Sequence, residues 1–399
     1  MKVLQVNSVC GFGSTGRIAT DIADLLLARG DDCKIVYGRG DAPEKYRGIA
    51  EKISSPFDNK VHGVLTRLFD LHGFGSKNAT RDLIKKIRGY GPDLVHLHNL
   101  HGYYLNIEIL FRYLKKAGIP VVWTLHDCWT MTGHCSHFSA VGCNRYQTEC
   151  HNCPQLKEYP ATLFGGNVKN NYKRKKKAFT GVKDLTIITP SQWLCDVVKT
   201  SFLKEYPVLP IYNGVDLSIF YPRESDFKKK HGLEDKIMLL GAASTWTERK
   251  GLYDFVSLSK RLDPKYKLVL TGLSDEQIRT LPDGIVKLGR TETMEELAEI
   301  YSAADIFINA SVEETMGLTT AEALACGTPV ITYNKTAVPE VPDKTCGIVV
   351  EPGVENLLSA LEKVDFSAED CVRRGQFFEK TKQFEKYLAV YDQIVKKDK

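Results

Sequence analysis

Two glutamates, Glu314 and Glu322, mark the part of this sequence where residue type and spacing point most directly to chemistry. Seven residues separate them, and Gly317-Leu318 lies between them, where an apolar helical pattern begins. A strand-like run, 305–311, comes just before, so we expect a strand, a glycine turn and a helix start in succession. The free amides at such a helix start can hold an anion, and ionised carboxylates nearby can accept hydrogen bonds from sugar hydroxyls.

This pattern is typical of a site for a nucleotide sugar. Its alternative interpretation is a surface helix with two solvated acids and a buried Ala/Leu face. The residues after Glu322 favour the site, because they read Ala323-Leu324-Ala325-Cys326-Gly327-Thr328-Pro329-Val330. With its two glutamates, the segment resembles the donor-site signature of retaining glycosyltransferases of family 4, which have the GT-B fold. Further landmarks of that family recur in order over nearly the whole chain.

The resemblance implies an α/β protein of GT-B architecture, with two doubly wound Rossmann-like domains that face each other across a deep cleft. It implies a nucleotide-diphosphate sugar as donor, retention of anomeric configuration and transfer without a catalytic metal. In such a site Glu314 holds sugar hydroxyls, Glu322 holds the ribose, and the amides of Gly317 and Leu318 hold the diphosphate. Within the family, the chain resembles bacterial enzymes of exopolysaccharide and colanic-acid type.

Two cations, Arg249 and Lys250, precede Gly251 at another expected helix start. Cations there oppose the helix dipole, so an anion such as a donor diphosphate would account for them. They would also stabilise charge on the leaving phosphate. The resemblance assigns a catalytic role to Lys250, which with Gly251 matches the family's Lys-Gly. The upstream arginine usual in the family is absent at residues 243–245, and we expect Arg249 to substitute for it.

The first strand leads into a glycine-rich turn, from which the resemblance carries over Gly13 and Gly16 as donor-binding residues, with Arg17 less clear. The spacing is not that of a dinucleotide fingerprint. At the end of the strand 121–125, the His126-Asp127 turn resembles the family turn whose histidine contacts the transferred sugar. His126 is therefore expected to orient the sugar, without shuttling a proton.

Apolar runs that alternate with helical patterns position these residues. Continuous apolar strands of this kind indicate parallel sheets covered on both faces. We predict strands at 3–7, 34–37, 94–97, 121–125, 186–189, 237–240, 267–271, 286–288, 306–309, 330–332 and 348–350. The domains are expected at 1–207 on the acceptor side, at 208–376 on the donor side, and at 377–399 as a helix that crosses back to the first domain.

Five of the eleven cysteines crowd into an expected insertion at about 128–155. Cys150 and Cys153 form a Cys-x-x-Cys knuckle, and with Cys135 and Cys143 they supply the four thiols of a structural zinc site. An iron–sulfur cluster would use the same ligands. Free thiols in an ordered loop, or two disulfides, are the alternatives. Any metal would be structural.

Length and composition set the remaining limits. With 399 residues, 43% hydrophobic and 26% charged, the chain suits two globular domains. The sequence lacks a bilayer-length apolar run and the apolar core of a signal peptide, so we expect a cytoplasmic protein. A basic run at 169–177 predicts attraction to an anionic membrane surface on the inner face, with a solvated helix face as the alternative. No nucleic-acid recognition motif accompanies it.

The function predicted on these grounds is transfer of a sugar from a nucleotide-diphosphate sugar to a glycan acceptor, expected to be lipid-linked, in polysaccharide biosynthesis. One rival is another GT-B enzyme, either a nucleotide-sugar epimerase or a glycan phosphorylase. The other rival is a non-catalytic scaffold that retains the fold.

Overall fold

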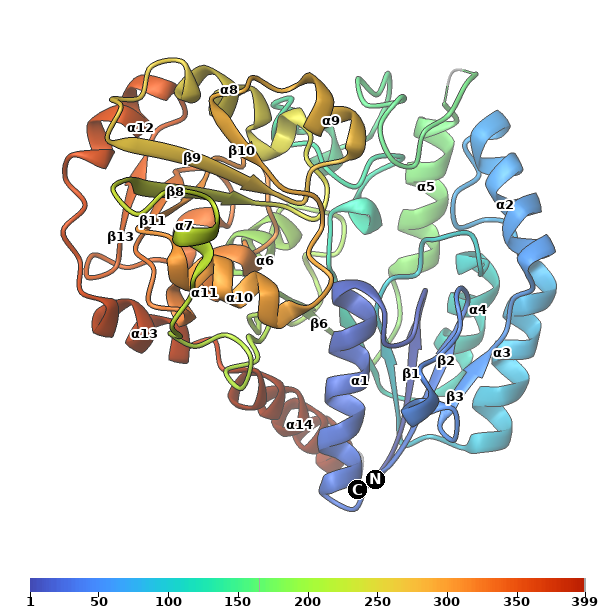
Figure 1. Cartoon of the computed structure of the whole chain (residues 1–399). Helices are drawn as coiled ribbons and strands as arrows, with labels where there is room; N and C mark the ends of the chain where they lie inside the picture. Colours follow the sequence, from blue (N-terminus) through green and yellow to red (C-terminus); the bar gives the residue numbers. More distant parts are fainter. Residues whose placement is uncertain (165, 398–399) are drawn as a thin grey trace. The chain divides into compact units, whose positions relative to one another are not determined.

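The computed structural model describes residues 1–164 and 166–397. Within them the chain divides into two compact units: unit 1 comprises Met1–Ile211 together with the C-terminal segment from Phe384, and unit 2 comprises Tyr212–Gln383. Each unit is built around one parallel sheet with helices on both faces (Figure 1). This arrangement confirms the predicted doubly wound α/β class.

Unit 1 holds a seven-stranded sheet in the order β3-β2-β1-β4-β5-β6-β7. Every pair of neighbouring strands is parallel. Its strands are β1 (Lys2–Asn7), β2 (Asp32–Tyr37), β3 (Ala50–Lys52), β4 (Leu94–Leu97), β5 (Val121–Thr124), β6 (Leu185–Thr189) and β7 (Val208–Pro210). The covering helices are α1 (Gly13–Ala28), α2 (Pro56–Phe69), α3 (Lys77–Tyr90), α4 (Ile107–Ala117), α5 (Val168–Phe179) and α6 (Gln192–Lys199).

The strands of unit 1 bury both faces, because successive side chains point to opposite sides of the sheet. Leu4, Val95 and Trp123 pack into one core cluster with α4 and α5. Val3 and Val122, at adjacent positions, pack into the other cluster with α1. Unbroken apolar runs are therefore what such a sheet requires.

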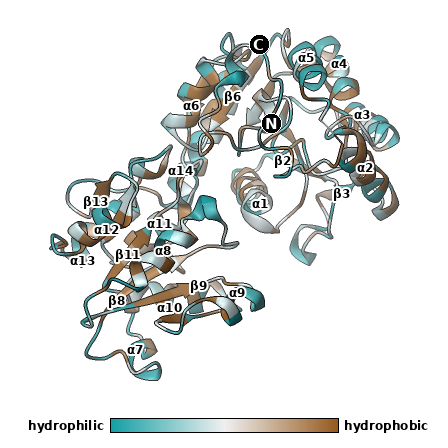
Figure 2. Cartoon of the chain, turned by 90° about the horizontal axis from the view of Figure 1, so that it is seen from above, coloured by the Kyte–Doolittle hydropathy of each residue, from teal (hydrophilic) through white to brown (hydrophobic). Residues whose placement is uncertain are grey.

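Unit 2 holds a six-stranded parallel sheet in the order β10-β9-β8-β11-β12-β13. The strands are β8 (Ile237–Ala242), β9 (Tyr266–Thr271), β10 (Ile285–Lys287), β11 (Ile306–Asn309), β12 (Val330–Tyr333) and β13 (Gly347–Val350). Its helices are α7 (Phe227–Lys230), α8 (Leu252–Ser259), α9 (Asp275–Thr280), α10 (Met294–Ala303), α11 (Leu318–Ala325), α12 (Val354–Leu361) and α13 (Ala368–Gln376). The strands of this sheet are drawn brown, for hydrophobic residues, in Figure 2.

The last helix, α14 (Lys380–Lys397), returns the chain to unit 1. Tyr387 and Tyr391 are fully buried in the same core cluster as Ile22 of α1. The Tyr391 hydroxyl also lies 2.6 Å from Nδ1 of His96 in β4. Within the described residues, no helix is long and apolar enough to cross a membrane.

Candidate active site

Unit 2 places its candidate residues at the point where the strand order reverses. From β8 the chain proceeds to β9 on one side, and later to β11 on the other, so the carboxyl ends of β8 and β11 lie next to each other. Ligands of open parallel sheets bind at such a switch point. The loop after β8 carries Arg249 and Lys250, and the loop after β11 carries Glu314 and Gly317.

Hydrogen bonds tie these two loops together. The Lys250 ammonium contacts Glu314 Oε1, and Arg249 Nη1 donates to the Glu313 carbonyl at 2.6 Å. The Arg249 carbonyl in turn accepts from the Val312 amide at 2.9 Å. The Lys250 and Glu314 side chains retain 21% and 15% of their exposure, so the pair is largely buried yet open to a ligand.

The charge state of Glu314 follows from these neighbours. Burial raises the pKa of the Glu314 carboxyl, but the Lys250 ammonium and the Arg249 guanidinium outweigh burial and hold that pKa below its usual value. Ser311 Oγ also donates to Glu314 Oε1 at 3.1 Å, and the Glu314 amide donates to Thr336 Oγ1 at 2.9 Å. Glu314 is therefore an ionised and fixed hydrogen-bond acceptor.

The helix that follows, α11, begins beside this pair. Gly317 is its N-cap at φ 89°, with no side-chain capping bond and no acid in the first turn. The first-turn amides of a helix lack intrahelical partners, so those of α11 are suited to an anion. Glu322 lies further along α11 and is half-buried; its Oε2 accepts a 3.2 Å hydrogen bond from the buried Tyr301 hydroxyl.

In unit 1 the corresponding switch point lies between β1 and β4. The turn after β1 leads directly into α1, which begins at Gly13 with no side-chain cap and no acid in its first turn. The Gly11 amide donates to the Gly16 carbonyl at 3.1 Å. A Cβ on Gly16 would lie 3.1 Å from the Gly11 nitrogen, a tight contact that glycine avoids in this close turn.

His126 follows β5 and belongs to a chain of side-chain hydrogen bonds in unit 1. Its Nε2 lies 3.2 Å from His98 Nδ1, and His98 Nε2 lies 2.9 Å from Gln5 Oε1. The Gln5 amide is oriented by its 2.8 Å bond to the Ala19 carbonyl. Since Gln5 Oε1 can only accept, His98 Nε2 carries a proton, and His126 Nε2 must then donate to His98.

Burial of the His126 imidazole keeps it uncharged. Burial lowers the pKa of His126 to about 4, against the opposing influence of Asp127. At neutral pH the ring is therefore neutral, with Nδ1 as its unprotonated nitrogen. An imidazole in this state can accept a hydrogen bond from a hydroxyl but cannot act as a proton donor at Nδ1.

Comparison with known proteins agrees with this geometry. A family model described as Glycosyltransferase Family 4 matches residues 15–219, more than half of the chain. A second model, described as Glycosyl transferases group 1, matches residues 234–364. The chain belongs to glycosyltransferase family 4.

Relatives of this glycosyltransferase match it over its whole length. A protein of Escherichia coli (strain K12) assigned to colanic acid biosynthesis, the glycosyl transferase WcaC, is 25% identical over 99% of this chain and 100% of its own. The sucrose-phosphate synthase of Thermosynechococcus elongatus aligns over 98% of both chains, with a TM-score of 0.73 and 18% identity. Anabaena HepE in complex with UDP aligns over 98% of this chain and all of its own, with a TM-score of 0.67 and 16% identity. These structures confirm the predicted GT-B fold.

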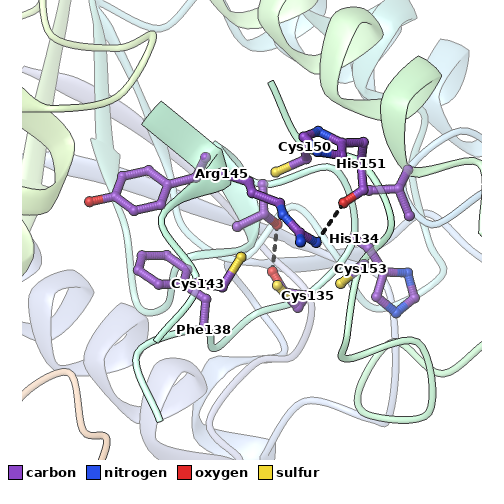
Figure 3. A pocket seen from close by; sticks show the side chains of 11 residues that line it. His134, Cys135, Phe138, Cys143, Arg145, Cys150, His151 and Cys153 are labelled. Atoms are coloured by element: carbon purple, nitrogen blue, oxygen red, sulfur yellow. Dashed lines mark hydrogen bonds between the residues drawn. The ribbon is translucent and has the colours of Figure 1, made fainter. Parts of the chain in front are cut away.

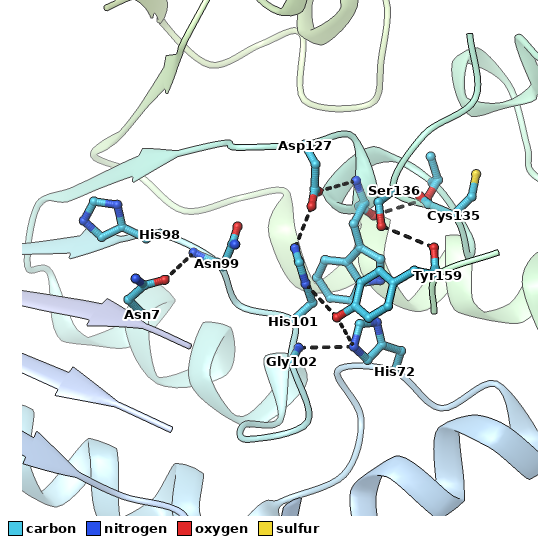
Figure 4. A network of polar contacts seen from close by, with 12 residues as sticks. Asn7, His72, His98, Asn99, His101, Gly102, Asp127, Cys135, Ser136 and Tyr159 are labelled. Atoms are coloured by element: carbon cyan, nitrogen blue, oxygen red, sulfur yellow. Dashed lines mark hydrogen bonds and ion pairs between the residues drawn. The ribbon is translucent and has the colours of Figure 1, made fainter. Parts of the chain in front are cut away.

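Near His126 the glycosyltransferase has a second polar network, which the sequence did not reveal (Figure 4). Asp127 Oδ2 lies 2.8 Å from His101 Nε2, and its Oδ1 accepts from the Trp129 amide at 2.9 Å. His101 Nδ1 continues the network to the Tyr159 hydroxyl at 3.1 Å. Burial raises the pKa of Asp127, but His101 and the hydrogen bonds outweigh burial and lower it to about 2. Asp127 is therefore ionised and held in place.

The cysteine-rich segment of the glycosyltransferase surrounds a small cavity of about 10 Å³ (Figure 3). Its lining includes Cys135, Cys143, Cys150 and Cys153, and all four are free thiols. The cavity is about the size of one ion or water. Within residues 1–164 and 166–397, however, no group of three or more His, Cys, Asp or Glu side chains is arranged to hold a metal ion. The arrangement of the four thiols gives the zinc site no support, and that site stays a prediction.

The basic run at 169–177 lies on α5, and part of it is engaged within unit 1. Lys169 and Lys173 pair with Glu149 at 3.0 and 3.3 Å, and Arg174 binds Glu108 through two hydrogen bonds. Lys175 is fully buried; its Nζ donates to the Trp129 carbonyl at 2.7 Å and lies 3.5 Å from the Trp129 ring centroid.

Burial is the largest influence on Lys175 and lowers the pKa of its ammonium to about 7. Lys175 therefore holds α5 against the core and cannot meet a headgroup. Of the six cations in this run, only Lys176 and Lys177 are exposed without an acidic partner among the described residues. The run is consequently a weaker candidate for a membrane contact than its sequence predicts.

Proposed function

We propose that this glycosyltransferase transfers a sugar from a nucleotide-diphosphate sugar to a glycan acceptor, with retention of anomeric configuration. One observation carries the proposal: the buried Lys250–Glu314 pair lies next to Arg249 and the uncapped start of α11, at the switch point of the unit 2 sheet. Two cations and a helix N-terminus suit a diphosphate, while an ionised carboxylate suits the hydroxyls of the attached sugar.

The named relatives support the choice of donor and the setting. Structures of Anabaena HepE are described in complex with UDP and with UDP-glucose. The Escherichia coli relative is assigned to colanic acid biosynthesis. We therefore propose polysaccharide biosynthesis as the setting, with a lipid-linked glycan as the acceptor.

For the donor we propose the following contacts. Glu314 accepts hydrogen bonds from hydroxyls of the transferred sugar, and Glu322 accepts one from the ribose. Arg249, Lys250 and the amides of Gly317 and Leu318 hold the diphosphate and neutralise the charge that grows on the departing phosphate, so the transfer needs no metal ion. In unit 1, Gly13 and Gly16 let the backbone approach the donor, and neutral His126 accepts a hydrogen bond from the sugar at Nδ1.

The chemical step follows from these roles. The bond between the anomeric carbon and the phosphate oxygen breaks, and the acceptor oxygen forms the new bond on the same face of the sugar. The acceptor proton passes to the departing phosphate oxygen. We prefer this route to a covalent intermediate because the carboxylates of Glu314, Glu322 and Asp127 already bind protein groups at 3.2 Å or less.

The test is a thermal-shift titration with UDP, GDP, ADP, CMP and dTDP. A ligand that binds only the native state raises the melting temperature by mass action. One nucleotide is expected to stabilise the wild type, and Glu322→Ala to weaken that increment, whereas Glu299→Ala on the exposed face of α10 leaves it unchanged. The increment is the readout, because Glu322→Ala also removes the partner of Tyr301. If no nucleotide at millimolar concentration raises the melting temperature, the result would favour the alternative hypothesis of a non-catalytic scaffold.

The other GT-B activities are separated by their products. An epimerase would convert the nucleotide sugar with no acceptor present, and a phosphorylase would consume phosphate and release a sugar phosphate. The transferase proposed here releases the nucleoside diphosphate in step with growth of the acceptor.

A further inference from the structure

Helix α2 of unit 1 turns its apolar side outward. Phe57, Val61 and Val64 are 74%, 43% and 55% exposed. They recur at the spacing of one helix face. The side chains that α2 buries are His62 and Thr66. A helix of a globular protein ordinarily packs its apolar stripe against the core, so α2 is inverted; its brown, hydrophobic stretches are visible in Figure 2.

The buried side of α2 is polar because the loop after it needs acceptors there. His62 Nε2 accepts from the amides of Gly73 and Gly75, both at 3.2 Å, and His62 Nδ1 lies 2.8 Å from Ser76 Oγ. A Cβ on Gly75 would collide with the His62 ring. These contacts fix the rotation of α2, so its outward apolar stripe is a feature of the fold.

A second segment extends the apolar surface at the end of α2. The Leu163 amide donates to the Arg67 carbonyl at 2.8 Å, and the Thr162 hydroxyl donates to the same carbonyl at 3.2 Å. Leu163 and Phe164 are 59% and 67% exposed. We call Phe57, Val61, Val64, Leu163 and Phe164 together the apolar ridge.

Exposed cations border the apolar ridge. Lys60 and Arg67 lie on α2, and Lys77 and Arg81 lie in the first turns of α3. Between these helices is a hollow of about 530 Å³, lined by apolar side chains of α2 as well as by Lys77 and Arg81. None of these four cations has an acidic partner in the described part of the chain. The acids nearby are engaged: Asp58 caps α2, and Glu108 binds Arg174.

We propose that α2 docks this protein on an anionic lipid bilayer. The apolar ridge enters the boundary between headgroups and acyl chains, and the four cations meet headgroup phosphates. This inference deepens the proposed function, since a lipid-linked acceptor lies at such a surface, but the docking itself does not depend on the donor site.

The charges favour a bilayer over a second copy of the chain. A symmetric dimer through the ridge would bring the same face of both copies together. Lys60 and Arg67 of one copy would then lie close to those of the other, and like charges would oppose the contact. An anionic surface removes this repulsion.

The experiment is co-sedimentation of the full chain with vesicles of phosphatidylcholine containing about one third phosphatidylglycerol. We expect the partition constant to be at least about tenfold lower for vesicles of pure phosphatidylcholine. For the anionic vesicles it should fall as the salt concentration is raised. Phe57→Ser/Val64→Ser and Lys60→Glu/Arg67→Glu are each expected to lower the partition constant about tenfold or more. The matched controls, Leu27→Ser on α1 and Lys176→Glu/Lys177→Glu on α5, should bind as the wild type does.

A second measurement does not depend on disruptive substitutions. Phe57→Trp keeps a large apolar side chain, and its fluorescence should be quenched by brominated lipids in the anionic vesicles. Three results would each overturn the proposal: absence of quenching, vesicle binding at the wild-type level by both the apolar and the charge-reversal double variants, or a dimer that dissociates on Phe57→Ser/Val64→Ser. Nucleotide thermal shifts of the same variants separate the two claims, because loss of vesicle binding with an intact shift leaves the donor site standing.

Discussion

Replacing Lys250 by methionine tests the candidate donor site most severely. Methionine has a similar length and no charge, so Lys250→Met removes the ammonium that contacts Glu314 Oε1 while it largely keeps the side-chain volume. Ser311 Oγ at 3.1 Å and the nearby Arg249 guanidinium then remain as partners of the Glu314 carboxylate. The substitution should therefore affect both stability and activity, by different amounts.

The stability change can be judged from the exposure of the pair. Removing one partner of a fully buried ion pair costs about 3–5 kcal/mol, whereas exposed pairs contribute about 1 kcal/mol or less. With side chains 21% and 15% exposed, Lys250→Met should lower the free energy of unfolding by about 2 kcal/mol. The double variant Lys250→Met/Glu314→Gln, which leaves no unpaired charge, should recover about half of this loss.

The loss should also depend on pH. Because the pKa of Glu314 is depressed in the folded protein, its stabilising contribution is present above the pKa of the unfolded carboxyl and disappears as the pH falls through the folded pKa. Without Lys250 this depression shrinks. The difference in unfolding free energy between wild type and Lys250→Met is therefore expected to be largest near neutral pH and smaller in acid.

Activity should follow a different order. Losing a cation that stabilises the departing phosphate lowers the turnover number by about 10² to 10³, and Glu314→Gln cannot restore that charge. Urea denaturation and release of nucleoside diphosphate by the three variants and the wild type measure the two effects. Recovery of activity along with stability in the double variant, or wild-type turnover by Lys250→Met, would contradict the proposed role of Lys250.

Three further changes test other features of the protein. Gly251→Ala should destabilise unit 2 by about 1–3 kcal/mol in urea unfolding, because Gly251 has φ 76° and a Cβ there meets the Ala310 carbonyl; an unchanged midpoint would contradict this. Gln5→Leu removes the acceptor that sets the tautomer of His126, so turnover should fall on the order of tenfold with the donor KM unchanged. EDTA should leave transfer unaffected, and a rate restored only by added metal would refute metal-free transfer.

Much of the fold could be predicted from the sequence, because both sheets are buried on two faces. The apolar runs indicate eleven strands, and each of them corresponds to a strand of the structure. The strands that were missed are the edge strands β3 (Ala50–Lys52) and β7 (Val208–Pro210), whose residues are half-buried or exposed and leave no apolar run. Val208–Pro210 pairs with β6 and belongs to unit 1, directly before the boundary between the two units.

The donor side of the candidate site was predictable because its parts lie in two short segments with strong local patterns. The histidine network of unit 1 was not, because His101 and Asp127 come from different loops that only the sheet brings together. For Lys175 the sequence pattern predicts the wrong environment. It lies among five other cations and would be expected to be exposed, yet it is buried. In α2, periodicity alone would assign the core to the wrong face.

Calorimetric titration of the nucleoside diphosphate chosen by the thermal-shift panel shows whether Lys250 contributes to diphosphate binding. Wild type, Lys250→Met and the control Glu299→Gln would be compared under identical conditions. We expect one site per chain, with affinity at least about tenfold lower in Lys250→Met and unchanged in the control. Equal affinity in all three proteins would contradict the assignment of the diphosphate to Lys250 and the α11 N-terminus.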